Sequence, residues 1–73
     1  MTTLFEEARQ HQLRDWGART LGLTYKCRVG DESFLATTPE GSEHLLRIDY
    51  GREEVWDLSS GRHVVICKPI AAE

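Results

Sequence analysis

The spacing of apolar residues changes once along this chain, near residue 22. Before that point the apolar residues project onto one broad face at about 3.6 residues per turn, namely Leu4, Phe5, Ala8, Leu13 and Trp16. Thr3 and Glu6 match a capping box, and either Gly17 or Gly22 can adopt the left-handed conformation that ends a helix. The first part of the chain is therefore predicted to form one helix over residues 3–19.

From Leu23 onward apolar and polar residues alternate, which is the pattern of a strand with one buried face. Turn-forming residues interrupt the alternation at near-regular intervals. The segments between them predict strands over residues 23–29, 33–38, 43–50, 53–58 and 62–69. Because such short connections pair successive strands antiparallel, we expect an α+β fold. In it, the N-terminal helix packs on a five-stranded antiparallel meander that curls toward a small SH3-like or OB-like barrel.

The last predicted strand differs from the others because its apolar residues are consecutive. The run from Val64 to Cys67 lies between Gly61 and Pro69, which favour turns and chain ends. A short continuous apolar run of this kind is typical of a strand buried on both faces. We expect the rest of the chain to fold against it.

Length and composition limit the classes of function. The chain has 73 residues, 40% hydrophobic and 29% charged, which indicates a single globular domain and argues against disorder. A chain this short has little material for the walls of a deep pocket. It has no phosphate-binding glycine loop, and Glu53 and Glu54 would point to opposite faces of a strand. We expect a protein that is not an enzyme and needs no cofactor.

The apolar runs and the cysteines indicate the cellular compartment in which the protein is expected. No run reaches the length of a membrane span, and the first seven residues do not resemble a signal peptide. Two isolated cysteines, Cys27 and Cys67, fit a reducing compartment, so we expect a cytoplasmic protein without a membrane partner. If the sheet closed, the two sulfurs could meet; the simpler interpretation is two buried thiols. The cysteines and histidines lack the close spacings of zinc sites, so no metal site is expected.

Charge is the most informative feature for function. The formal net charge is −3, and the segment from residue 31 to residue 57 has eight acidic and two basic residues. If its strands share a face, that face would attract a basic partner. The simpler interpretation is that these acids keep a small domain soluble and protect the sheet edges. The candidate partner-binding residues are Asp31, Glu32, Glu40, Glu43, Asp49, Glu53, Glu54 and Asp57.

The charge pattern predicts a small protein-binding module or inhibitor that binds a basic protein partner. Chains of this size and charge occur among small phage-encoded inhibitors and adaptors, whose carboxylates can replace phosphates in a nucleic-acid-binding site. A homodimer, formed through an exposed edge strand or through the helix, is compatible with so small a core.

The alternative function is nucleic-acid binding by a small β-barrel. Lys26 and Arg28 would share one face of the first strand, and Arg47 would extend this basic group. Trp56 would supply an aromatic platform for a base. The acidic net charge and the lack of a basic run oppose this alternative.

Overall fold

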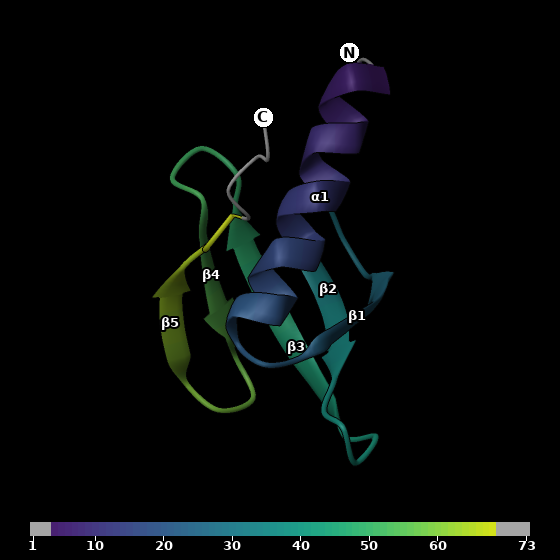
Figure 1. Cartoon of the computed structure of the whole chain (residues 1–73), viewed down its shortest axis with the longest axis vertical. Coiled ribbons are helices and arrows are strands. Elements are labelled where there is room, and N and C mark those ends of the chain that lie inside the picture. Colours follow the sequence, from purple (N-terminus) through teal and green to yellow (C-terminus); the bar gives the residue numbers. More distant parts are fainter. Residues whose placement is uncertain (1–3, 69–73) are drawn as a thin grey trace.

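The computed structural model describes residues 4–68 and shows the predicted combination of a helix and a five-stranded antiparallel sheet (Figure 1). The elements are α1 (Leu4–Thr20), β1 (Thr24–Arg28), β2 (Ser33–Thr37), β3 (Glu43–Asp49), β4 (Glu54–Asp57) and β5 (Arg62–Val65). All five strands end before the residue predicted for them, by one residue in each of β1 to β4 and by four in β5. Thr3 of the predicted capping box and Pro69 of the predicted last strand lie outside the described residues.

The strands follow one another across the sheet in chain order, β1-β2-β3-β4-β5, and each is antiparallel to its neighbour. A barrel would require β1 and β5 to pair, and these strands instead form the two opposite edges. The α+β fold is thus confirmed as an open sheet, and the barrel-like curl is not confirmed. For the same reason Cys27 and Cys67 do not meet; both are free and exposed instead of buried.

The helix covers one face of the sheet through a narrow stripe (Figure 1). Its buried residues are Leu13, Arg14, Gly17 and Ala18. The prediction that Leu4 and Phe5 belong to the packed face is wrong: they are 85% and 83% exposed. These two residues lie at the N-terminal end of α1, which extends past the ends of the strands in Figure 1, so no part of the sheet lies beneath them.

The core lies between this stripe and the three central strands. Its largest fully buried side chains are Leu13, Phe34, Leu46, Ile48 and Val55. Burial of each such side chain contributes about 1.5–3 kcal/mol relative to exposure. The helix lies close to the sheet at Gly17, where an added Cβ atom would lie 3.6 Å from side-chain atoms of both Val55 and Ile66. That distance is an ordinary contact and leaves room for a methyl group.

The helix ends in a Schellman motif. The N–H of Leu23 donates to the carbonyl of Ala18 at 2.8 Å, and the N–H of Gly22 donates to the carbonyl of Arg19 at 2.9 Å. Gly22 has a φ of 78°, which is the left-handed conformation that this motif requires. Ala18 and Leu23 are both buried, as expected for the apolar pair that accompanies the motif. Of the two candidate glycines, Gly22 therefore ends the helix and Gly17 lies within it.

The prediction that the last strand is buried on both faces is wrong. β5 is an edge strand that pairs only with β4 among the described residues. Val65 is 63% exposed, while Val64 is half-buried and Ile66 is buried. A single helix cannot cover both faces of a sheet, so the apolar run alternates between a covered side and an open side.

We expect the same substitution at two glycines to have opposite effects on stability. Gly17→Ala should raise the free energy of unfolding by about 0.5–1 kcal/mol, because alanine favours the helix and its methyl group fits against the sheet. Gly22→Ala should lower it by about 1 kcal/mol, because alanine is disfavoured at positive φ. Urea denaturation of the two variants measures both values. A destabilised Gly17→Ala variant would show that the helix packs more tightly than described.

Candidate functional site

One face of the sheet is left uncovered by α1. Directly paired residues on neighbouring strands point to the same side, so the register shows which residues share this face. Arg47, Trp56 and His63 form one row across β3, β4 and β5. We define the open face by the residues Leu35, Glu43, Leu45, Arg47, Asp49, Glu54, Trp56, His63 and Val65.

Trp56 lies at the centre of this row and is held by its neighbours. The rings of Trp56 and His63 are stacked, with 4.5 Å between centroids and an interplanar angle of 3°. The guanidinium carbon of Arg47 lies 6.0 Å from the centroid of the indole. Because Arg47 and His63 come from the strands on either side of β4, they flank opposite faces of the ring. His63 Nε2 in turn donates to Glu54 at 2.9 Å.

Aliphatic side chains surround this row. Leu45, Leu58 and Val65 are exposed, and Leu35 is half-buried. Leu58 follows β4, and its N–H donates to the carbonyl of Leu45 at 2.9 Å. The open face therefore combines an aromatic centre with exposed aliphatic groups, which is the composition of the centre of many protein interfaces.

Three of the eight predicted acidic residues lie on the open face, namely Glu43, Asp49 and Glu54. Asp49 and Glu54 are directly paired across β3 and β4, so two carboxylates stand side by side. Like charges in this position destabilise a sheet. Asp49 Oδ1 accepts from the N–H of Arg52 at 3.0 Å, which offsets part of the repulsion.

Four more of the predicted acidic residues lie in turns. Asp31 and Glu32 lie between β1 and β2, Glu40 between β2 and β3, and Glu53 between β3 and β4. The first and third of these turns are at one end of the sheet and the second is at the other. The structure therefore does not gather all eight acids on one surface.

Glu53 is engaged within the molecule. It forms ion pairs with Lys68 at 2.9 Å and with Arg9 of α1 at 3.1 Å. The hydrogen bond from Lys68, together with the charges of Lys68 and Arg9, holds the pKa of Glu53 below its ordinary value. Glu53 also has a φ of 56°, a conformation that favours glycine, and its carbonyl accepts from the N–H of Ile66 at 2.8 Å. This residue therefore connects the helix, the turn and the segment after β5.

Asp57 does not belong to any exposed surface, which corrects its assignment as a partner-binding residue. It points to the helix side and is 2% exposed. His44 Nδ1 donates to one carboxylate oxygen at 2.8 Å, and the N–H groups of Ser59 and Ser60 donate to the other at 3.0 and 3.2 Å. These donors make Asp57 a structural residue of the turn between β4 and β5.

A β-bulge divides the residues predicted to bind nucleic acid. The register between β1 and β2 shifts between Tyr25 and Cys27, so Arg28 pairs with Phe34 on the helix side. Lys26 forms an ion pair with Glu43. Lys26 and Arg28 therefore do not form one basic surface, and only Arg47 and Trp56 of this set are in contact.

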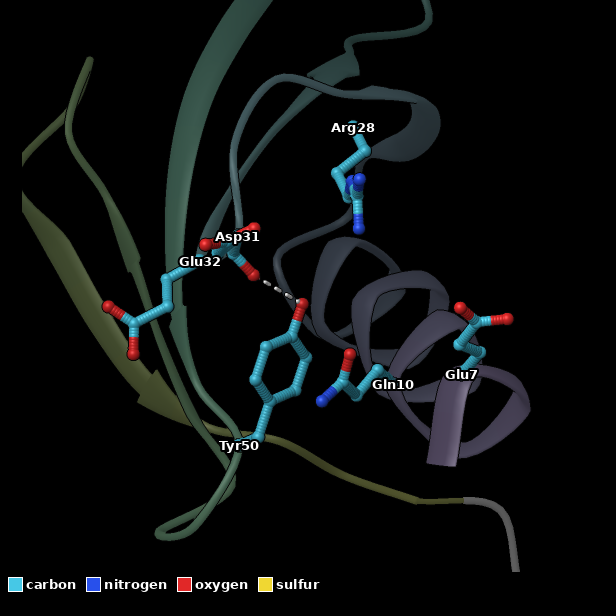
Figure 2. Close-up of a pocket in the computed structure, with 6 residues that line it drawn as sticks. All are labelled: Glu7, Gln10, Arg28, Asp31, Glu32 and Tyr50. Atoms are coloured by element: carbon cyan, nitrogen blue, oxygen red, sulfur yellow. Dashed lines mark hydrogen bonds between the residues drawn. The ribbon is translucent and has the colours of Figure 1, made fainter. Parts of the chain in front are cut away.

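A polar pocket of about 460 Å³ lies between α1 and two turns (Figure 2). Its lining residues are Glu7, Gln10, Arg28, Asp31, Glu32 and Tyr50. Figure 2 shows Tyr50 beside Gln10 with its hydroxyl directed at Asp31, whose carbonyl accepts from it at 3.1 Å. The same hydroxyl accepts from Arg14 at 2.7 Å. The lining carries charges of both signs, and the hydroxyl is already occupied as donor and as acceptor.

Residues 4–68, which the structure describes, lack two kinds of feature. They contain no group of three or more histidine, cysteine, aspartate or glutamate residues placed to hold a metal ion. They also contain no helix with the length and apolar character needed to cross a membrane. Comparisons with protein-family models, with curated proteins and with solved structures gave no significant match.

Sequence reasoning missed the apolar part of the open face. Leu35 and Leu45 were visible as the alternate positions of their strands, opposite the apolar residues of the predicted core. The residues next to His63 in the sequence do not indicate that its ring stacks on Trp56. Since both faces of β2 and β3 carry apolar residues, alternation alone cannot tell which face the helix covers.

We expect Asp57 to make stability depend on pH. Burial alone would raise the pKa of Asp57, but the hydrogen bonds from His44, Ser60 and Ser59 outweigh it and lower the pKa below its ordinary value. A carboxyl group with a lowered pKa in the folded state stabilises the fold above its unfolded pKa, and this contribution disappears as pH falls through the folded pKa. Asp57→Asn should therefore cost about 1–3 kcal/mol at pH ~7 and progressively less below pH ~4.

Urea denaturation at several pH values measures this difference. The control is Glu40→Gln, which removes an exposed turn carboxylate and should change stability by less than about 0.5 kcal/mol. A constant difference between the wild-type protein and the Asp57→Asn variant down to pH ~2 would contradict the assignment.

Proposed function

We propose that this chain is a non-enzymatic protein-binding module whose contact surface is the open face. The observation that supports the proposal best is the placement of Trp56, held between Arg47 and His63 on the side of the sheet that the helix leaves uncovered. Tryptophan and arginine are among the residues most enriched at the positions that dominate binding energy in protein interfaces. A ring that is already held by its neighbours loses little freedom on binding.

The charges of the open face favour a partner with basic side chains. Asp49 and Glu54 stand opposite each other, and a lysine or arginine placed between them would relieve their repulsion. Glu43 adds a third carboxylate, although Lys26 pairs with it. We therefore propose a partner with an apolar patch bordered by lysine or arginine. The proposed contact surface therefore has three acidic residues at the margin of an apolar centre, in place of the eight acidic residues predicted from the sequence.

The size of the open face predicts the strength of binding. Five strands spaced about 4.8 Å apart, with about five residues each at about 3.3 Å, give a footprint of roughly 19 by 16 Å. Stable interfaces bury about 800 Å² on each partner, which is more than such a footprint offers. We therefore expect a weak and transient complex, unless the partner also contacts the turns.

Two narrower functions are related to this proposal. An inhibitor of the phage-encoded kind would place the open-face acids in a basic site of its partner, where they replace phosphates. Nucleic-acid binding is the weaker alternative, because Arg47 and His63 already flank both faces of the indole on which a base would stack. Titration with single-stranded oligonucleotides at low salt tests it, and binding that salt abolishes would favour it over the protein-binding proposal.

The proposal predicts that peptides selected on this protein bind the open face. A displayed library of random peptides is the probe, and selected peptides should combine apolar residues with lysine or arginine. Trp56→Ala should weaken their binding by at least about tenfold, because it removes the central anchor without touching the core on the other face. Backbone amide and indole NMR shifts should change for open-face residues when a selected peptide is added.

Two triple variants with equal charge separate position from net charge. Glu43→Gln, Asp49→Asn and Glu54→Gln remove three open-face acids, whereas Asp31→Asn, Glu32→Gln and Glu40→Gln remove three turn acids. Only the first set should weaken binding. Equal weakening by both sets, or selected peptides that ignore Trp56→Ala, would refute the open face as the contact surface. Circular dichroism checks that each variant is folded.

A further inference from the structure

The two edges of the sheet are protected to different degrees. β1 has a bulge between Tyr25 and Cys27, an exposed lysine at Lys26, and α1 packed beside it. These are devices that keep other strands from pairing with an edge. β5 has no bulge and no lysine or proline within Arg62–Val65, and no strand lies beyond it in the described part of the chain (Figure 1).

The ladder between β4 and β5 shows which backbone groups of the edge are free. Bonded pairs alternate with non-bonded pairs in an antiparallel ladder. The N–H of Ile66 donates to the carbonyl of Glu53, so Val64 and Arg62 also direct their backbone groups toward β4. The backbone groups of His63 and Val65 therefore point away from the sheet. The edge ends at Cys67, whose N–H donates to Thr20 Oγ1 at 3.0 Å.

We infer that β5 pairs with β5 of a second copy of this chain to form a two-fold symmetric dimer. An antiparallel pair centred on Val64 places His63 opposite Val65 of the second copy, and Val65 opposite its His63. These are the residues with free backbone groups, so two bonded pairs and four hydrogen bonds form without any change in the ladder to β4. The free backbone groups of His63 and Val65 in both copies are thus all hydrogen-bonded in the dimer.

The side chains of β5 are compatible with this register in position and in charge. His63 and Val65 both lie on the open face, so the pairing keeps every side chain on its own side of the sheet. Arg62 would face Ile66 of the second copy, so no like charges stand opposite each other. The two open faces then join in one continuous ten-stranded sheet. The dimer does not depend on the proposed protein-binding function, because it uses the edge and leaves the open face free.

Sedimentation over a range of protein concentration tests the dimer. The mass of the wild-type protein should double from 8.3 kDa as concentration rises to the millimolar range. Val65→Pro should remain a monomer, because proline removes an outward N–H that β4 does not use. The matched control Val65→Thr keeps that N–H and should still dimerise. A wild-type protein that stays monomeric, a Val65→Pro dimer or a Val65→Thr monomer would each overturn the inference.

Cysteine cross-linking tests the register in variants that carry no proline, so the result does not depend on how Val65→Pro affects folding. In a background with Cys27→Ser and Cys67→Ser, Val64→Cys should form a disulfide between two copies on mild oxidation. Its Cα atom would lie about 4.5 Å from its equivalent across a non-bonded pair. Val65→Cys is the control and should not cross-link, because its equivalents are two positions apart in the ladder. Efficient cross-linking of the Val65→Cys variant, or none of the Val64→Cys variant, would show that the register is wrong.

Discussion

The fold depends on the packing of one helix against one face of the sheet. Leu13, Gly17 and Ala18 are buried residues of α1, and the helix lies close to Val55 and Ile66 at Gly17. The residues that become fully buried come from α1, β2, β3 and β4. In a chain of 73 residues this is the main source of apolar stabilisation, and it can serve only one side of the sheet.

The open face follows from this one-sided packing. Its aromatic residue is not left unsupported, because Trp56 is stacked on His63 and approached by Arg47. Contacts of this kind bury part of the ring within the monomer and reduce the apolar area that water must cover. The face can therefore remain exposed in the free protein while keeping a large aromatic group available. A face that served only solubility would not need a tryptophan at its centre.

Polar contacts at one end of the sheet hold the helix to the turns. Arg9 reaches Glu53, and Arg14 donates to the hydroxyl of Tyr50, which donates to the carbonyl of Asp31. Arg14 is only 7% exposed, and its Nε has no hydrogen-bond partner among the residues that the structure describes. An arginine buried in this way is costly unless it contributes to positioning. Its contact with the ring of Tyr25, at 5.9 Å, offsets part of that cost and links β1 to the same group.

The sequence by itself determined the order and type of the elements. Helical spacing up to Trp16, alternation from Leu23 and turn residues at regular intervals are local signals, and short turns leave antiparallel pairing as the only arrangement of neighbours. Tertiary structure decided which face of the sheet is covered and which strand becomes an open edge. It also decided that a bulge turns Arg28 to the helix side and that Asp57 is buried while Glu43, Asp49 and Glu54 are not. These outcomes depend on where one helix docks and on contacts between residues far apart in the chain, and a local pattern carries no information about either.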